Sequence, residues 1–386
     1  MFASNDDDRT RKRSGVTLWI GGTSSLTRTF VRHCGSEGLI LMGLESIPPS
    51  WVCNDGSIHY VRCNLMSICS EKSARATLEQ IPKCLDMLSS IVVGVRPPLI
   101  APYAKDDHDN QRVVRGIQYL LQAACELCPR LNLVLHISSV AAMDHLRTQH
   151  MLSEKEPFPI SLQEYPATYD RFKRACEETI TTVCEKRMVP FCHLRLSAIF
   201  SDDHACIQCR ALHLQRFIGP YLPVAIDCNS SANVSRAIDS LLRMRVEQEQ
   251  DATKRPPVQN IYHYTRPLAL KSPMPYGYYL QQYRMAHNLE RTSIWIPVWV
   301  VTCLVALVHS LAHLCSRLNI SIPYLDAFDY LLQVSSREHS FDCSLFGNDF
   351  PELQEESILE CFQRHRELLK RDGNGGVSTP GLKKQI

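Results

Sequence analysis

The chain has 386 residues, with 42 lysines and arginines against 40 aspartates and glutamates, and 45% of its residues are hydrophobic. This length suits one domain plus a smaller one, and the composition excludes a disordered regulator, a fibrous repeat and a protein with many membrane spans. The near balance of charge gives no field that would attract nucleic acid, so none is expected as a partner.

Both ends of the chain and its cysteines bear on its surroundings. Residues 1–14 and 376–386 are polar and predict flexible tails. The N-terminal residues lack the apolar stretch of a secretory signal, so the protein is not expected to be secreted. The 17 cysteines are scattered, and they are expected to be reduced and mostly buried.

Strand-like and helix-like segments alternate along the first half of the chain. Apolar runs predict strands over residues 16–20, 39–44, 58–61, 88–95, 131–137 and 193–200. Helical spacing of apolar residues predicts helices over 26–34, 113–125 and 169–187. This alternation predicts an α/β fold: a Rossmann-type, doubly wound parallel sheet over residues 15–200. A smaller, mostly helical substrate-binding part is expected over 201–375, with returns to the sheet at about 234–264.

The first strand, Val16–Ile20, is followed by a glycine turn and a helix. A tight turn that leads into a helix N-terminus suits a dinucleotide pyrophosphate. Glu45 ends the second strand, 24 residues after Gly21, where a carboxylate can bind ribose hydroxyls and repel a 2′-phosphate, which favours NAD over NADP. The candidate cofactor residues here are Gly21, Gly22, Thr23, Ser24, Ser25, Leu26 and Glu45.

The turn departs from a Gly-x-x-Gly-x-x-Gly pattern at two positions. Ser24 and Thr27 stand where the second and third glycines are expected. The Ser24 hydroxyl could turn to a phosphate, whereas Thr27 needs extra room where the helix packs on the strand. The alternative is an ordinary strand–helix corner that binds no cofactor.

Three polar residues form a candidate catalytic set. Tyr169 and Lys173 are four residues apart, which places them on one helix face, and the lysine ammonium stabilises the phenolate form of a neighbouring tyrosine. The pair could then act as a general acid and base on an alcohol or ketone. Ser139 follows the fifth strand, at the sheet edge where α/β ligand sites form, and could hydrogen-bond the substrate oxygen.

Further motifs occur in an order that resembles the extended short-chain dehydrogenase/reductase superfamily. Within it, the chain is similar to the 3β-hydroxysteroid dehydrogenase and 4-carboxysterol 3-dehydrogenase group over roughly residues 15–370. The segments that carry the resemblance are Ile20–Thr23, His136–Val140, the 30-residue step from Ser139 to Tyr169, Leu194–Phe200 and Phe341–Ser344. The chain departs from the family pattern at Ser24, Thr27, Asn64, Val113 and Leu196.

The resemblance implies a role for each candidate residue. Tyr169 would donate or accept the proton, Lys173 would hold the nicotinamide ribose, and Ser139 would orient the substrate oxygen. Asn64 and Leu65 would lie against the adenine of NAD. The implied reaction interconverts a secondary alcohol and a ketone on a sterol, triterpenoid or similar apolar ring. A carboxylate on the neighbouring carbon would then be lost as CO₂.

Residues 294–314 contain no aspartate, glutamate, lysine or arginine. Their length would suffice to cross a bilayer, but Pro297, His309 and His313 argue against a span. Two interpretations remain open: association with a membrane, either across it or in its interface, and a buried helix or hairpin under the substrate site. The protein is therefore expected in the cytoplasm or on the cytosolic face of the endoplasmic reticulum.

Other readings of the sequence stay open. One is a nucleotide-sugar epimerase or dehydratase, or a reductase of flavonoid-type ketones. Another is a dinucleotide-binding protein without catalytic activity, which the altered glycine turn would permit. The resemblance also implies a homodimer. Cys206 and Cys209 with His204 have only part of a zinc-ligand pattern, so no metal is expected.

Overall fold

A computed structural model gives the structure of the chain. It describes residues 15–81, 85–98, 107–144, 146–165, 167–201, 203, 206–214, 218–220, 224–250, 259–289, 294–318, 325, 329, 333–334 and 337–374. Both expected tails lie outside the described residues.

A seven-stranded sheet forms the centre of the protein, and every pairing within it is parallel. The strand order is β12-β7-β5-β4-β1-β2-β3. The strands are β1 (Val16–Ile20), β2 (Leu39–Gly43), β3 (His59–Arg62), β4 (Leu88–Val93), β5 (Leu133–Ser139), β7 (Phe191–Leu196) and β12 (Ile261–His263). This confirms the predicted doubly wound parallel sheet.

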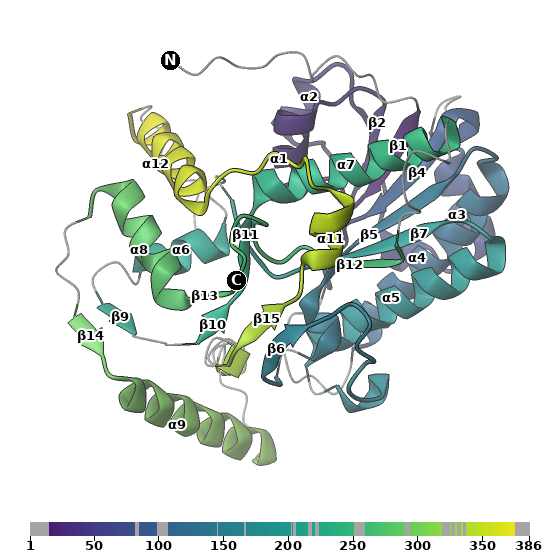
Figure 1. Cartoon of the computed structure of the whole chain (residues 1–386). Coiled ribbons are helices and arrows are strands. Elements are labelled where there is room, and N and C mark those ends of the chain that lie inside the picture. The colour runs from purple at the N-terminus through teal and green to yellow at the C-terminus, as the bar shows by residue number, and fades with distance from the viewer. Residues whose placement is uncertain are drawn as a thin grey trace.

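Helices cover both faces of the sheet (Figure 1). Side chains of a strand alternate between its faces. Leu18 therefore joins the apolar cluster under one layer of helices, while Trp19 joins the other cluster, where it packs edge-on against Phe30. The first layer consists of α3 (Glu71–Leu78), α4 (His108–Leu127) and α5 (Thr168–Arg187), and the second is built mainly from α1 (Ser25–Cys34) and α7 (Ser231–Gln250).

The predicted strand 193–200 is interrupted, which corrects one expectation. β7 ends at Leu196, and Ala198–Phe200 forms a separate strand, β8, that pairs with β11 (Cys228–Ser230) outside the main sheet. Between them, the Ser197 hydroxyl donates to the Thr265 carbonyl over 2.5 Å. The chain thus leaves the Rossmann sheet at Ser197 and enters the smaller part of the molecule.

The smaller part lies to one side of the sheet (Figure 1). Its apolar centre joins β8 to three helices through Phe200, Tyr279, Tyr283 and Phe362. The helices are α6 (Ile207–Leu214), α8 (Tyr276–His287) and α12 (Ile358–Asn374). A second sheet contains β13 (Met274–Pro275), β10 (Ala225–Ile226), β15 (His339–Phe341) and β6 (Gln149–Leu152).

The remaining elements are short, except for one helix. They are α2 (Ser50–Cys53), β9 (Ile218–Pro220), β14 (Ile294–Ile296), α9 (Val298–Arg317) and α11 (Ser344–Asp349). β14 pairs with β9, and α9 extends from there along the edge of the molecule, apart from the central sheet (Figure 1).

Candidate active site

The order of the strands places a crevice beside the first turn. From β1 the sheet continues to β2 on one side and to β4 on the other, so the connections leave β1 and β4 in opposite directions. Ligands of doubly wound sheets bind at this switch point, beyond the carboxyl ends of the strands. Backbone hydrogen bonds close the turn against both neighbours: Gly21 N donates to Met42 O, and Gly94 N donates to Ile20 O, each over 2.9 Å.

Two glycines in the turn are required by space. Gly21 has φ +81°, and a Cβ there would lie 2.5 Å from the carbonyl oxygen of Gly94. A Cβ on Gly22 would lie 2.9 Å from Cβ of Leu41. The turn can therefore lie this close to β2 and β4 only because both residues lack a side chain.

Ser24 caps the first helix. Its Oγ accepts the Thr27 backbone N–H over 3.2 Å and lies 2.9 Å from Oγ1 of Thr27, so it caps α1. Thr27 is fully buried. The Ser24 hydroxyl is thus engaged at the N-terminus of α1, and its contact with a phosphate stays a prediction.

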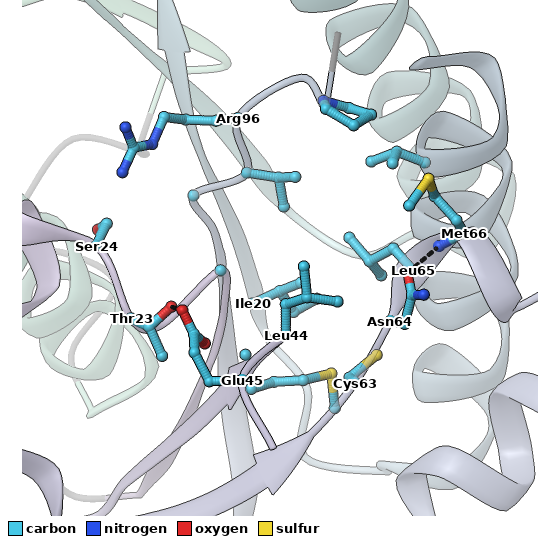
Figure 2. Close-up of a pocket in the computed structure, with 17 residues that line it drawn as sticks. Ile20, Thr23, Ser24, Leu44, Glu45, Cys63, Asn64, Leu65, Met66 and Arg96 are labelled. Atoms are coloured by element: carbon cyan, nitrogen blue, oxygen red, sulfur yellow. Dashed lines mark hydrogen bonds between the residues drawn. The ribbon is translucent and has the colours of Figure 1, made fainter. Parts of the chain in front are cut away.

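A cavity of about 300 Å³ opens beyond the turn (Figure 2). Six of the predicted cofactor residues line it: Gly21, Thr23, Ser24, Glu45, Asn64 and Leu65. Gly22, Ser25 and Leu26 lie in the turn and the first turn of α1 but are not among the lining residues. The turn, the end of β2 and the segment after β3 therefore contribute to one pocket.

Glu45 is held at one end of this pocket. The Thr23 hydroxyl donates to its carboxylate over 3.0 Å, and the Tyr60 hydroxyl donates to its backbone oxygen over 2.9 Å. Burial, together with the Glu45 carboxylate, raises the pKa of Tyr60 to about 12. Tyr60 therefore stays protonated and remains a hydrogen-bond donor to Glu45 at neutral pH.

Asn64 and Leu65 form the opposite wall. Asn64 Oδ1 accepts the Met66 N–H over 3.1 Å, which fixes the start of a short 3-10 turn. α4 passes close to Leu65 at Gly116, where a Cβ would lie 2.2 Å from the Leu65 carbonyl oxygen. Val113, also on α4, completes this wall of the pocket.

Lys173 reaches the carboxyl edge of the sheet from α5. Its ammonium donates to the carbonyl oxygens of Ile137 in β5, over 3.1 Å, and Val95 after β4, over 3.2 Å. The residue is 5% exposed. An ammonium has three N–H donors, so one has no acceptor among the described residues and can bind a ligand. Val95 also lines the pocket, so Lys173 contacts a residue of its wall.

Ser139 and Tyr169 lie on elements that meet beside this lysine. Ser139 is the last residue of β5, is buried, and its Oγ accepts the Ala141 N–H over 3.2 Å, which leaves its hydroxyl hydrogen to donate. Tyr169 is half-buried in the first turn of α5, which packs against residues 140–143. Within the described residues, no hydrogen bond joins these two side chains. Ser139, Tyr169 and Lys173 do not line the pocket that Glu45 lines.

A buried ion pair supports this edge, and the sequence motifs did not predict it. Glu177 follows Lys173 by four residues on α5, and its carboxylate accepts from Arg195 of β7 over 3.0 and 2.7 Å. Ser138 donates to the same carboxylate over 2.6 Å. The Arg195 guanidinium and these hydrogen bonds outweigh burial and lower the pKa of Glu177 to about 2. The sequence signal that could have found Glu177 is its position four residues after Lys173, one helical turn further along α5.

Two buried histidines, His136 and His193, lie beside this pair. Nδ1 of His136 lies 3.2 Å from Nδ1 of His193, and Nε2 of His193 lies 2.9 Å from the Thr181 hydroxyl. Burial lowers the pKa of His193 to about 4 and that of His136 well below its ordinary value. Both rings are therefore neutral at pH 7.

The Cys206–Cys209 pair lies at the start of α6. Sγ of Cys206 accepts the backbone N–H groups of Ser201 and Cys209 over 3.3 and 3.4 Å. No group of three or more metal-ligating side chains occurs in the part of the chain that the structure describes, and His204 lies outside that part. The pair is a buried local hydrogen-bond arrangement.

A family model for male sterility proteins, which carries the label of an NAD-binding domain, matches residues 107–215. The matched segment includes Ser139, Tyr169, Lys173 and Glu177 but not the glycine turn. No curated protein matches the chain.

Solved structures that resemble the chain cover nearly all of it. The crystal structure of gox2253 has a TM-score of 0.67 at 13% identity and covers 93% of this chain and 99% of its own. The Bordetella bronchiseptica enzyme WbmH, in complex with NAD⁺, has a TM-score of 0.62 at 10% identity, with coverage of 93% and 99%. DesIV, a dTDP-glucose 4,6-dehydratase from Streptomyces venezuelae with NAD and TYD bound, has a TM-score of 0.60 at 12% identity, with coverage of 93% and 98%.

The chain shares the fold of these proteins. The fold is what these structures establish for the chain, since they are only 10–13% identical to it. The comparisons do not single out the 3β-hydroxysteroid dehydrogenase-like group.

Proposed function

We propose that the protein is an NAD-dependent oxidoreductase that interconverts a secondary alcohol and a ketone on a sterol, triterpenoid or similar apolar ring. The observation that carries the proposal is the position of Lys173. Its ammonium is fixed by the strand ends of both β4 and β5, and Tyr169 lies one helical turn before it. A nucleotide-sized cavity begins at Val95, the residue whose carbonyl Lys173 contacts.

The pocket fits the adenosine half of NAD. Gly21, Thr23 and Ser24 of the turn line it, and Glu45 offers its carboxylate to ribose hydroxyls. A carboxylate at this place would repel a 2′-phosphate, which supports NAD over NADP. NAD bound in WbmH and in DesIV, which share this fold, also supports the choice of cofactor.

The residues at the other end of the crevice suit proton transfer. When bound, NAD supplies a hydride acceptor at its nicotinamide ring. The Lys173 ammonium stabilises the phenolate form of Tyr169, and this phenolate takes the proton of the substrate hydroxyl as the carbonyl forms, which leaves Tyr169 as the neutral phenol. The remaining Lys173 N–H holds a ribose hydroxyl. Ser139 donates its free hydroxyl hydrogen to the substrate oxygen.

The test is the Tyr169→Phe variant in a screen of sterol and triterpenoid alcohols with NAD, followed by nicotinamide absorbance. The variant should fold and lose about 10²–10⁴-fold in turnover, the usual worth of a positioned acid or base. Tyr278→Phe, on α8, is the matched control and should keep full activity. Near-normal turnover by Tyr169→Phe would rule out the proposed role. Substrates with a carboxylate next to the alcohol carbon should release CO₂ after oxidation.

A second candidate is a nucleotide-sugar epimerase or dehydratase. The likeness to DesIV, a dTDP-glucose 4,6-dehydratase, favours it. The same screen with UDP- and dTDP-sugars separates the two proposals, because only this candidate converts a sugar without net change in NAD. A flavonoid-type ketone reductase would instead convert flavonoid-type ketones in the same assay. Protein that binds NAD but converts nothing would favour the non-catalytic reading.

The apolar substrate class rests on α9. Most large side chains of this helix are exposed, led by Trp299 at 69% and Leu307 at 66%. A narrow stripe of Val308, Ala312 and Cys315 is buried. This corrects the interpretation of residues 294–314 as buried core. None of the described helices is both long and apolar enough to cross a bilayer.

We propose that α9 lies in the interface of a membrane and gives access to a lipid-dissolved substrate. Residues 294–316 contain no aspartate, glutamate, lysine or arginine, and α9 makes up most of this segment. An exposed apolar helix of this kind is costly in water and is stabilised among acyl chains. Neutral phosphatidylcholine vesicles should co-sediment with the protein, and Leu307→Glu with Leu311→Glu should abolish this. The control Leu369→Glu, which changes an exposed leucine on α12, should bind as the wild type does.

If the protein does not co-sediment with the vesicles, the membrane proposal is wrong. Light scattering during size-exclusion chromatography would test the expected homodimer. If the two α9 substitutions convert a dimer to a monomer and vesicles have no effect, then α9 pairs copies of the chain instead of contacting lipid.

A further inference from the structure

One N–H donor at the start of α1 is taken by a side chain. The first N–H groups of a helix have no backbone partner within the helix and are the groups that can hold a phosphate. Here one of these groups, the Thr27 N–H, is taken by Ser24 Oγ over 3.2 Å. The Cβ of Ser24 also occupies a position where a glycine would let the backbone approach the ligand.

A cation faces this turn across the mouth of the pocket. Arg96 follows β4, is exposed, and lines the same cavity as Ser24. Figure 2 shows its side chain reaching from the opposite wall toward the side where Ser24 and Thr23 lie. Within the described residues, no carboxylate forms an ion pair with its guanidinium. Arg96 therefore has no ion-pair partner among these residues that would compete with a bound anion.

Among the described residues, the pocket has one charged side chain of each sign. Seventeen of them line it, and within this set Glu45 is the only acidic one and Arg96 the only basic one. Figure 2 shows them on different walls, Glu45 at the end of β2 and Arg96 above the turn. An adenosine diphosphate moiety has the complementary arrangement, with hydroxyls on its ribose and negative charge on its phosphates.

We propose that Arg96 binds the pyrophosphate of the dinucleotide and replaces the contacts that the turn has lost at Ser24. A guanidinium can bind two phosphate oxygens through parallel N–H donors, which suits this role. The inference rests on the proposed function, since it assigns a residue to the cofactor of that reaction. It places phosphate recognition mainly on the loop after β4 instead of the glycine turn.

The experiment measures the affinity of the full-length protein for NAD, ADP and adenosine by calorimetric titration. Arg96→Gln should raise the Kd for NAD and for ADP by roughly ten- to a hundredfold, the worth of a hydrogen bond to a charged group. Adenosine, which has no phosphate, should bind both proteins equally. Arg96→Lys should recover only part of the affinity, because an ammonium cannot bind two oxygens in parallel.

Arg62→Gln is the matched control. Arg62 ends β3 next to the lining residue Cys63, is exposed, and does not itself line the pocket. Its removal changes the net charge by the same amount and should leave all three affinities unchanged. If Arg62→Gln weakens ADP binding as much as Arg96→Gln does, the effect comes from the general field and the inference is wrong.

The other outcomes separate this inference from the proposed function. Wild-type protein that binds neither NAD nor ADP overturns both. Wild-type protein that binds NAD, with an equal affinity in Arg96→Gln, overturns the inference alone. Arg96→Gln that loses NADP binding but keeps NAD and ADP binding also overturns it, because Arg96 would then contact a 2′-phosphate.

Discussion

Glu177 and Arg195 form a two-point ion pair, with N–O distances of 3.0 and 2.7 Å, in which both side chains are almost fully buried. The pair fastens α5 to β7 one turn beyond Lys173. Ser138 donates to the same carboxylate and is the residue before Ser139. Two of the candidate catalytic residues therefore lie next to groups that this ion pair positions.

Glu177→Gln should strongly destabilise the protein. It removes one charge of a buried pair and leaves the Arg195 guanidinium buried without its counter-ion, a change that costs about 3–5 kcal/mol of unfolding free energy. Glu178→Gln is the control, because Glu178 is 42% exposed and its partner Arg174 is 15% exposed, so water still solvates this pair and its loss should cost less than the loss of Glu177. Urea unfolding measures both. Equal losses from the two variants would contradict a special role for the buried pair.

The unfolding free energy of the protein should fall in two stages as the pH is lowered. The folded-state pKa of His193 is about 4, against an ordinary value of 6.5, because the ring is buried. The unfolded chain therefore binds this proton first, and stability should fall as the pH drops from about 6.5 to about 4. His263, with a pKa of about 3 for the same reason, adds to this stage.

Glu177 gives the second stage. Its folded-state pKa of about 2 lies below the ordinary 4.5, so its stabilising effect is complete above about pH 4.5 and is lost as the pH falls toward 2. Unfolding free energies measured between pH 8 and the acid midpoint would show both stages. In Glu177→Gln the second stage should shrink while the first persists. A single fall confined to pH below 4 would contradict the histidine contribution.

Glu45 should determine the choice between NAD and NADP. Glu45→Ser removes the acceptor for the ribose hydroxyls and the repulsion of a 2′-phosphate, so the preference for NAD should fall by roughly ten- to a hundredfold. Titration with both cofactors measures it. Glu37→Ser, at an exposed position away from the pocket lining, should leave the preference unchanged. An unaltered preference in Glu45→Ser would mean that the carboxylate does not contact the ribose.

The sequence predicted those parts of the molecule that local patterns determine. β1, its glycine turn and α1 form a continuous segment, and the turn has the two glycines that space demands at 21 and 22. The strand ending at Ser139 and the helix carrying Tyr169 were expected at nearly the observed bounds. Each of these features depends on residues that are close together in the chain.

The parts that were missed depend on residues far apart. Glu177 meets Arg195 across 18 positions, and Arg96 faces Ser24 only after β4 lies beside β1. Whether α9 is buried or exposed could not follow from its own composition, because an apolar helix suits either place. Its exposure depends on which elements pack against its Val308 and Ala312 stripe.

Ser24→Gly should strengthen cofactor binding at little cost in stability. Glycine at a helix N-cap costs only a few tenths of a kcal/mol relative to serine, by rough estimate. The change removes a Cβ from the turn and frees the Thr27 N–H, which Ser24 Oγ now accepts. One added hydrogen bond to a phosphate should lower the Kd for NAD roughly tenfold.

Ser24→Ala frees the same N–H but keeps the Cβ, so it separates the two effects. In the Arg96→Gln background, Ser24→Gly should restore part of the lost affinity. If Ser24→Gly binds NAD no more tightly than the wild type, the phosphates do not reach the end of α1.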